Sequence, residues 1–111
     1  MECIFCKIAA REITAREVYR DDDVVAIEDL NPQAPVHLLV MPVGHYASIV
    51  DAGAAGELVG KLTAIASSLG SARGGEDGFR LVVNTGPHGG QTVGHVHVHV
   101  LAGRPMTWPP G

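Results

Sequence analysis

The stretch Gly94-His95-Val96-His97-Val98-His99-Val100-Leu101 alternates histidine with valine near the end of the chain. Successive side chains of a β-strand point to opposite faces, so the alternation predicts a strand with the three histidines on one face and the valines on the other. Neighbouring imidazoles on one face of a strand stand roughly 7 Å apart, close enough for all three to meet one small anion. The stretch therefore predicts a chemical face and a core face on one strand.

A row of three histidines has two other interpretations, an adventitious metal-binding row and the solvated polar face of an edge strand. We favour a chemical role because crowded imidazoles hinder one another's protonation. At least one ring is then neutral near pH 7 and is available as a nucleophile, base or metal ligand.

The other elements indicate an α+β domain around an antiparallel sheet. Apolar periodicity and turn residues predict a short N-terminal helix over 3–10, a hairpin over 18–27, and strands over 37–41 and 79–83. A long amphipathic helix is predicted over 54–71. It rests on apolar residues that recur at spacings of four and three: Leu58, Leu62, Ile65 and Leu69. With the histidine strand this order gives five strands, and we expect residues 1–111 to form one domain.

Composition and charge exclude several classes of partner. The apolar runs are too short to cross a bilayer, and the amino terminus lacks a basic segment followed by an apolar one. We therefore expect a cytoplasmic protein without a membrane partner. A net charge of −4 with three consecutive acids at Asp21-Asp22-Asp23 argues against nucleic acid as a partner. The negative charge is still compatible with binding a single nucleotide through neutral hydrogen-bond donors.

Both cysteines of the chain lie in Cys3-Ile4-Phe5-Cys6. In a cytosolic protein this spacing indicates metal binding or redox chemistry more often than a structural disulfide. The motif precedes the strands and lacks the tryptophan and proline of a thioredoxin-type pair, so zinc is the better functional interpretation if two further ligands exist. Without such ligands, the pair is simply two half-buried thiols.

A glycine-rich segment, Gly89-Gly90-Gln91-Thr92, lies directly before the histidine stretch. Glycines let backbone N–H groups approach an anion closely, and consecutive amides form a concave anion site. Because this loop lies beside the histidines, it predicts a phosphate-binding site. The chemistry that follows is attack of an imidazole on phosphorus, with a phosphohistidine-type intermediate that water cleaves.

The histidine stretch resembles the histidine triad (HIT) superfamily, in which His, hydrophobic, His, hydrophobic, His is followed by two hydrophobic residues. Within it the chain is similar to the Hint branch, the histidine triad nucleotide-binding proteins. The matching segments span almost the whole chain: residues 3–8, 29–37, 83–84, 89–92, the triad, and the closing Trp108-Pro109-Pro110-Gly111.

The resemblance implies a HIT-like fold and a purine nucleoside phosphoramidase, which cleaves the P–N bond of purine nucleoside 5′-phosphoramidates and also acts on acyl-adenylates. By position, His97 would be the nucleophile that forms a covalent nucleotidyl-histidine. His37 and His99 would complete the polar network around the phosphate, and the backbone carbonyl of His95 would orient the His97 ring. No cofactor is required for this catalysis.

The resemblance also implies the nucleotide contacts. Asn84, Gly90, Gln91 and Thr92 match the phosphate side, and Asp29 matches the acid that holds the ribose hydroxyls. The walls of the purine slot match Phe5, Ile27 and Leu30. On the residues alone, three apolar side chains near a hairpin are core more often than pocket, and Asp29 equally suits the cap of its loop.

Three positions depart from the family pattern. Thr92 stands where serine is usual, and Gly94 and Ile27 stand where aromatic residues are frequent. The threonine keeps the hydroxyl and adds a methyl group. The other two changes remove packing groups, so base stacking beside Ile27 is weakened. All the groups that the chemistry needs are retained.

For zinc, the resemblance supplies the two missing ligands. Some bacterial-type members bind zinc with a Cys-x-x-Cys pair, one later histidine and the first histidine of the triad. Here these would be Cys3, Cys6, His45 and His95. Four such ligands make a closed, structural site. The alternative is that His45 is only a surface residue.

The resemblance further implies a homodimer in which the tail, residues 104–111 with Trp108, contributes to the interface and to the pocket. Three competing functions stay open. They are a dinucleoside polyphosphate hydrolase of the Fhit type, a non-catalytic purine-nucleotide-binding regulator, and a purely structural zinc module.

Overall fold

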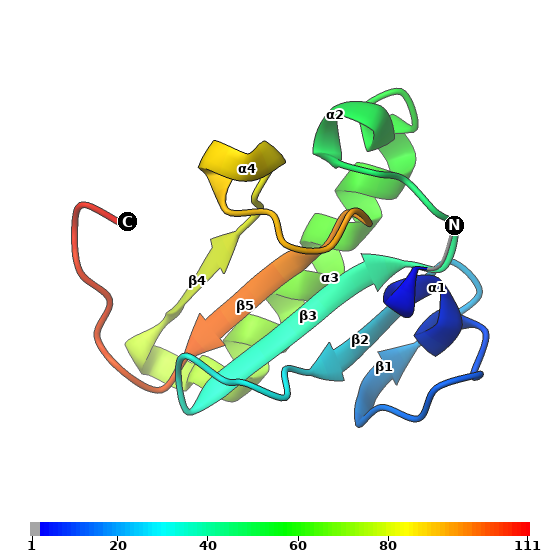
Figure 1. Cartoon of the computed structure of the whole chain (residues 1–111). Helices are drawn as coiled ribbons and strands as arrows, with labels where there is room; N and C mark the ends of the chain where they lie inside the picture. The colour runs from blue at the N-terminus through cyan, green and yellow to red at the C-terminus, as the bar shows by residue number, and fades with distance from the viewer. Residues whose placement is uncertain (1–2) are drawn as a thin grey trace.

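A five-stranded antiparallel sheet organises the chain, with the strands in the spatial order β1-β2-β3-β5-β4. The computed structural model describes residues 3–111 (Figure 1). The strands are β1 (Glu17–Arg20), β2 (Val24–Glu28), β3 (Val36–Pro42), β4 (Phe79–Val82) and β5 (Val98–Ala102). The helices are α1 (Ile4–Ala9), α2 (Ile49–Ala52), α3 (Gly56–Gly74) and α4 (Gly86–Gly89), with a 3-10 turn, η1 (Gly75–Asp77). The α+β class and the five strands are confirmed.

The long helix α3 covers one face of the sheet (Figure 1). Its buried residues Leu62 and Ala66 pack on strand residues of β3 and β5 that include Val98 and Val100. Leu58, Ile65 and Leu69 pack against the same cluster, as their spacing predicts. Val98 and Val100 of the histidine stretch therefore do face the core.

The short helix α1 lies over the opposite face of the sheet (Figure 1). Its residues Phe5 and Ile8 are buried against side chains of β2 and β3, namely Val25, Ile27, Leu39 and Met41. Because residues on a strand alternate between faces, this is also the face on which His37 and His99 project. The sheet thus separates the core under α3 from the histidines under α1.

The predicted strand over the histidine stretch begins too early. β5 starts at Val98, and the chain before it is irregular. The N–H of His95 donates to the carbonyl of Val93, and the N–H of Val96 donates to Tyr46, which lies in the segment after β3. The backbone of His95 therefore does not pair with a neighbouring strand. The three histidines are consequently not equivalent residues on one face of a single strand.

The glycine-rich loop also differs from expectation, because residues 86–89 form the one-turn helix α4. Gly90 closes it in the left-handed conformation, with φ of 84°, which glycine adopts without strain. Within the described residues, no helix combines the length and hydropathy needed to span a membrane.

Candidate active site and metal centre

The pairing of β3 with β5 brings two of the predicted histidines together. Leu39 lies opposite His99, and His37 lies opposite Leu101, so His37 and His99 are diagonal neighbours on one face. Nε2 of His37 lies 2.9 Å from Nδ1 of His99. This hydrogen bond joins residues that are 62 positions apart in the chain.

Backbone groups define the direction of this hydrogen bond. The N–H of Gln33 donates to Nδ1 of His37 at 3.0 Å, so the proton of a neutral His37 is on Nε2. His37 then donates to Nδ1 of His99, and a neutral His99 carries its proton on Nε2. Burial lowers the pKa of His37. Burial and the neighbouring rings of His97 and His37 lower the pKa of His99 to about 4, so both rings are neutral near pH 7.

The ring of His97 is oriented by the backbone of His95. Its Nδ1 lies 2.8 Å from the carbonyl oxygen of His95, the contact that the resemblance implied. A carbonyl only accepts, so Nδ1 carries the proton and, in the neutral ring, the lone pair lies on Nε2. Phe5 packs edge-on against the same ring with centroids 5.0 Å apart, and His99 lies at 4.9 Å on another side. His97 thus presents a fixed nitrogen lone pair.

His97 and His99 line a cavity of about 300 Å³ between α1 and the sheet. Five other predicted residues also line it: Phe5, Ile27, Asp29, Leu30 and Thr92. The walls are largely apolar, as a slot for a flat base would be. Sequence reasoning missed the side chains that complete these walls, among them Ile8, Ala15, Leu39 and Val93. No local motif marks them, because only the packing of α1 on the sheet gathers them.

Asp29 lies at the rim of this cavity and makes two contacts. One carboxylate oxygen accepts from the N–H of Asn31 at 2.8 Å, which is the loop cap left open by the sequence. The other oxygen lies 3.4 Å from Nε2 of His37. Asp29 thus joins its loop to the histidine pair.

Gln91, Gly90 and Asn84 do not line the cavity. The side-chain amide of Gln91 is occupied by the protein itself. Its oxygen accepts from the N–H of Gly86, and its nitrogen donates to the carbonyls of Ala47 and Val93. The side chain of Gln91 therefore holds neighbouring loop segments together, and the contact of this residue with phosphate stays a prediction.

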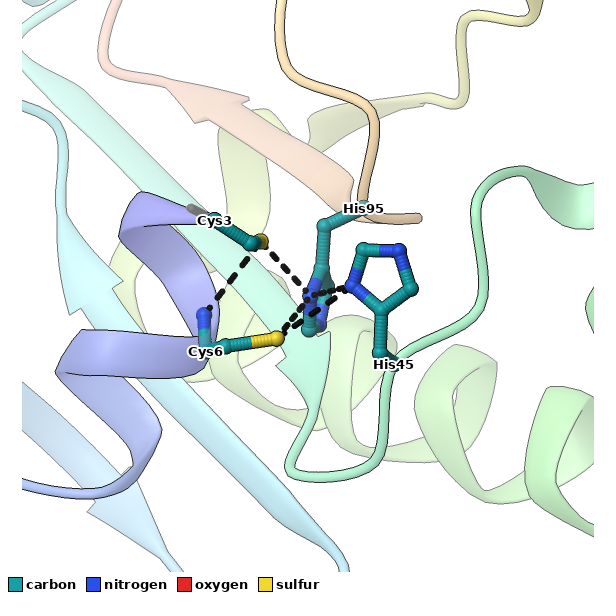
Figure 2. Close-up of side chains that lie close together, drawn as sticks. All are labelled: Cys3, Cys6, His45 and His95. Carbon is teal, nitrogen blue, oxygen red and sulfur yellow. Dashed lines mark hydrogen bonds between the residues drawn. The ribbon is translucent and has the colours of Figure 1, made fainter. Parts of the chain in front are cut away.

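The four predicted metal ligands meet at one point, as Figure 2 shows. They come from the N-cap and first turn of α1, from the segment after β3 and from the segment before β5, and their ligand atoms all lie within 4.8 Å of one another: Cys3, Cys6, His45 and His95. Nδ1 of His95 is 3.3 Å from Sγ of Cys3, and Nδ1 of His45 is 3.2 Å from Sγ of Cys6. His45 is exposed, yet its ring joins the cluster.

The chemistry of this cluster fits a closed metal site. Nε2 of His95 donates to the carbonyl of Pro42 at 2.9 Å, which leaves the lone pair of Nδ1 facing the two sulfurs. Burial lowers the pKa of His95, and a neutral imidazole is the form that binds metal. Two thiol sulfurs and two imidazole nitrogens form a donor set that zinc prefers.

Asp29, His37 and His99 form a second group of possible ligand atoms. Here the Nε2–H of His37 points directly at Nδ1 of His99, so a hydrogen-bonded network accounts for their approach. The described residues therefore hold one candidate metal centre and one separate histidine network.

Known proteins are similar to this chain over nearly its whole length. A family model described as HIT domain matches residues 10–106. The crystal structure of a HIT family hydrolase from Legionella pneumophila superposes with a TM-score of 0.95 and 47% identity, covering 99% of this chain and 100% of the other. A 14 kDa zinc-binding protein of Zea mays is 44% identical, covering 97% of this chain and 87% of the relative.

A Zn-bound histidine triad family protein from Mycobacterium smegmatis superposes with a TM-score of 0.84 and 30% identity, covering 94% of this chain and 76% of the other. The domain match, the sequence identity and the superposition extend over nearly the whole chain and include the histidines of the site. The chain belongs to the HIT domain family.

Proposed function

We propose that this protein is a purine-nucleotide-binding hydrolase that cleaves the P–N bond of purine nucleoside 5′-phosphoramidates, and also acyl-adenylates, through a nucleotidyl-His97 intermediate. The observation that carries the proposal is the orientation of His97. Its Nδ1 is held by the carbonyl of His95, so its Nε2 lone pair is free beside an apolar cavity of about 300 Å³. The similarity to a protein named HIT family hydrolase supports the reaction class.

In the proposed first step, Nε2 of His97 attacks phosphorus and the P–N bond breaks. The leaving nitrogen takes its electron pair and a proton from Nε2 of His99, and departs as the amine. The positive charge on the nucleotidylated ring of His97, whose centroid lies 4.9 Å from that of His99, offsets the negative charge left there. The Nε2–H of His37 stabilises Nδ1 of His99 during this step.

In the second step, water attacks phosphorus and breaks the bond to Nε2 of His97. One proton of the water returns to His99, and the nucleoside monophosphate leaves. Over the cycle His99 gives one proton and recovers one, so the net reaction is hydrolysis. Asp29 and Thr92, both at the cavity, are proposed to hold the ribose and phosphate.

The test is AMP release from an adenosine 5′-phosphoramidate, with mass spectrometry of quenched early time points. We expect turnover and an adduct on His97 in the wild type, and neither in folded His97→Ala. His88→Ala is the matched control, because His88 is exposed on α4. If the wild type binds AMP but shows no turnover and no adduct, the phosphoramidase proposal fails. A polyphosphate hydrolase or a nucleotide-binding regulator would then be tested.

We further propose that the Cys3, Cys6, His45 and His95 cluster holds a structural zinc ion. A zinc ion there would join α1 to the segment that carries the nucleophile, and no step of the reaction passes through it. The similarity to a zinc-binding protein of maize and to a Zn-bound mycobacterial protein supports the choice of metal.

The proposed assembly is a homodimer that includes the tail. β4 is an edge strand with Phe79 partly exposed, and Trp108 in the tail is 84% exposed. Pairing with a second copy would cover such an edge. Sedimentation at twice the chain mass of 11.6 kDa is the expected result.

A further inference from the structure

An arginine outside the cavity is connected to the histidine network. Nε of Arg104, two residues after β5, donates to the carbonyl of Gln33 at 3.0 Å. The N–H of the same Gln33 donates to Nδ1 of His37 at 3.0 Å. Arg104 is therefore two hydrogen bonds away from His37 and three from His99.

The loop that carries Gln33 is largely exposed to solvent. Residues 30–33 and Pro35 are exposed, and only Ala34 is buried. The side chain of Gln33 donates to the carbonyl of Asn31, a bond within the same loop that does not tie it to the sheet. Arg104 supplies a tie to the chain after β5, because its Nε donates to the carbonyl of Gln33 while its Nη1 donates to the carbonyl of Pro105 within the tail.

The backbone conformation at Gly103 allows the contact between Arg104 and Gln33 to form. Gly103 has φ of 92°, and a Cβ atom placed there would lie 2.8 Å from Cβ of Pro35. Only glycine allows the chain to pass so close to the loop in this conformation. The close approach of Gly103 to Pro35 brings Arg104 beside Gln33.

We propose that Arg104 is a positioning residue for the phosphoramidase reaction, which holds the backbone of Gln33 through its carbonyl so that the N–H on the other side of the Gln33 Cα selects the tautomer of His37. The inference rests on the proposed function for its catalytic meaning. With the Gln33 N–H in place, His37 keeps its proton on Nε2 and donates to His99. His99 then presents Nε2–H to the cavity, as the first step of the reaction requires.

Without this contact the loop loses its tie to the tail, and the N–H of Gln33 is no longer held on Nδ1 of His37. The two tautomers of a neutral imidazole differ little in energy unless a neighbour selects one. His37 would then populate both forms, and the form with a proton on Nδ1 reverses the hydrogen bond to His99. A fraction of the molecules would present the wrong nitrogen to the substrate.

Two control variants separate this role from simple anchoring. Arg80 on β4 donates to the carbonyl of Thr107, so Arg80→Met removes another arginine that anchors the tail. Gln33→Ala removes the side chain of Gln33 and keeps the peptide N–H and carbonyl. Arg104 is exposed, so Arg104→Met retains the core.

The experiment records the ¹⁵N shifts of the His37 and His99 rings of the full chain by NMR, and measures kcat and KM. We expect a single Nε2–H tautomer of His37 in the wild type, Arg80→Met and Gln33→Ala. In Arg104→Met we expect mixed tautomers, with kcat lower by roughly ten- to a hundredfold and KM little changed.

Unchanged ring shifts in Arg104→Met would overturn the inference, even with activity lost. Equal tautomer mixing in Arg80→Met would also overturn it, since tail anchoring alone would then suffice. If the wild type has no phosphoramidase activity but Arg104→Met still mixes the tautomers, the proposed function fails and the positioning of His37 by Arg104 is supported.

Discussion

The ring of His99 is partly buried among other imidazoles, and this surrounding controls its charge. Burial is the main cause that lowers its pKa to about 4, followed by the nearby His97 and His37, while Asp29 acts in the opposite direction. A neutral ring is what the proposed direction of proton transfer needs, because His99 must accept from His37 and still carry a proton on Nε2. The charge state and the hydrogen-bond direction therefore support each other.

The first prediction concerns stability against pH. The ordinary value of 6.5 applies to the unfolded chain, so between pH 6.5 and about 4 the unfolded state binds a proton at His99 that the folded state does not. The contribution of His99 is complete above pH 6.5 and is lost as the pH falls toward 4. His99→Gln should therefore show a smaller fall in free energy of unfolding between pH 7 and pH 5, by about 1 kcal/mol because the ring is partly exposed.

Thermal or urea unfolding at pH 7, 6 and 5 tests this expectation. Burial lowers the pKa of His37 and His95 in the same direction, so the wild type and the variant should both lose stability in acid. Equal slopes for the two proteins would contradict the shift at His99.

At the scale of elements, α1 depends on contacts from outside itself. Six residues are too few for a helix to be stable alone. Phe5 and Ile8 pack on the sheet, and the guanidinium of Arg20 on β1 donates to the carbonyls of Ile8 and Ala9 at the end of the helix. At the other end, Sγ of Cys3 accepts from the N–H of Cys6. Metal binding would complete this attachment at the start of α1.

The second prediction is that Cys6→Ser removes the bound metal and lowers the melting temperature. A metal that binds only the folded state stabilises it by mass action, so a chelator should lower the wild-type melting temperature and leave that of the variant unchanged. Metal content and melting curves give the measurement. Ile4→Ala on the same helix, where Ile4 is 49% exposed, is the control and should keep its metal. A wild type indifferent to chelation would contradict the zinc proposal.

The third prediction uses two glycines of α3. A Cβ atom at Gly70 would lie 2.5 Å from the Phe79 ring, whereas one at Gly60 meets no atom within 4 Å. Gly70→Ala should destabilise the protein by about 1–3 kcal/mol through overpacking against β4. Gly60→Ala should stabilise it by about 0.4–1 kcal/mol, since alanine favours the helix. Urea unfolding distinguishes them, and equal effects would show that α3 is not held against β4 as described.

At the scale of the whole molecule, the tail extends from the sheet with its tryptophan in solvent. Trp108 is 84% exposed, so little of the chain's own stability depends on it. The proposed dimer would instead place the tail against the other copy, where it contributes to the pocket. Loss of the tail should therefore affect the activity of the protein more than its stability.

The fourth prediction is that deleting residues 108–111 changes substrate preference more than stability. We expect the ratio of kcat/KM between phosphoramidates with small and with bulky amines to shift severalfold, while the melting temperature changes by only a few degrees. Both enzymes are assayed on the same pair of substrates. An equal effect on both substrates would argue against selection by the tail.

Much of the site was predictable because its signals are local. The α3 stripe follows from the helical period of Leu58 and its neighbours, and the Cys-x-x-Cys pair lies on one helical turn. The cavity walls were only partly predictable, because Ala15 and Val93 carry no signal of their own. The hydrogen bonds of the Gln91 side-chain amide to three backbone groups were not predictable, because they depend on how the surrounding loops fold.

The alternation of histidine and valine by itself determined that one face of β5 is core and the other polar, because the direction of side chains on a strand is a local property. Only the tertiary structure decided which imidazole lies at the cysteines and which one pairs with His99. His95 turns to the cysteines because Pro42 and the segment at Tyr46 hold it there, and His37 replaces it beside His99 through the register of β3 with β5. Because such contacts join residues tens of positions apart, the spacing of residues along the chain does not predict them.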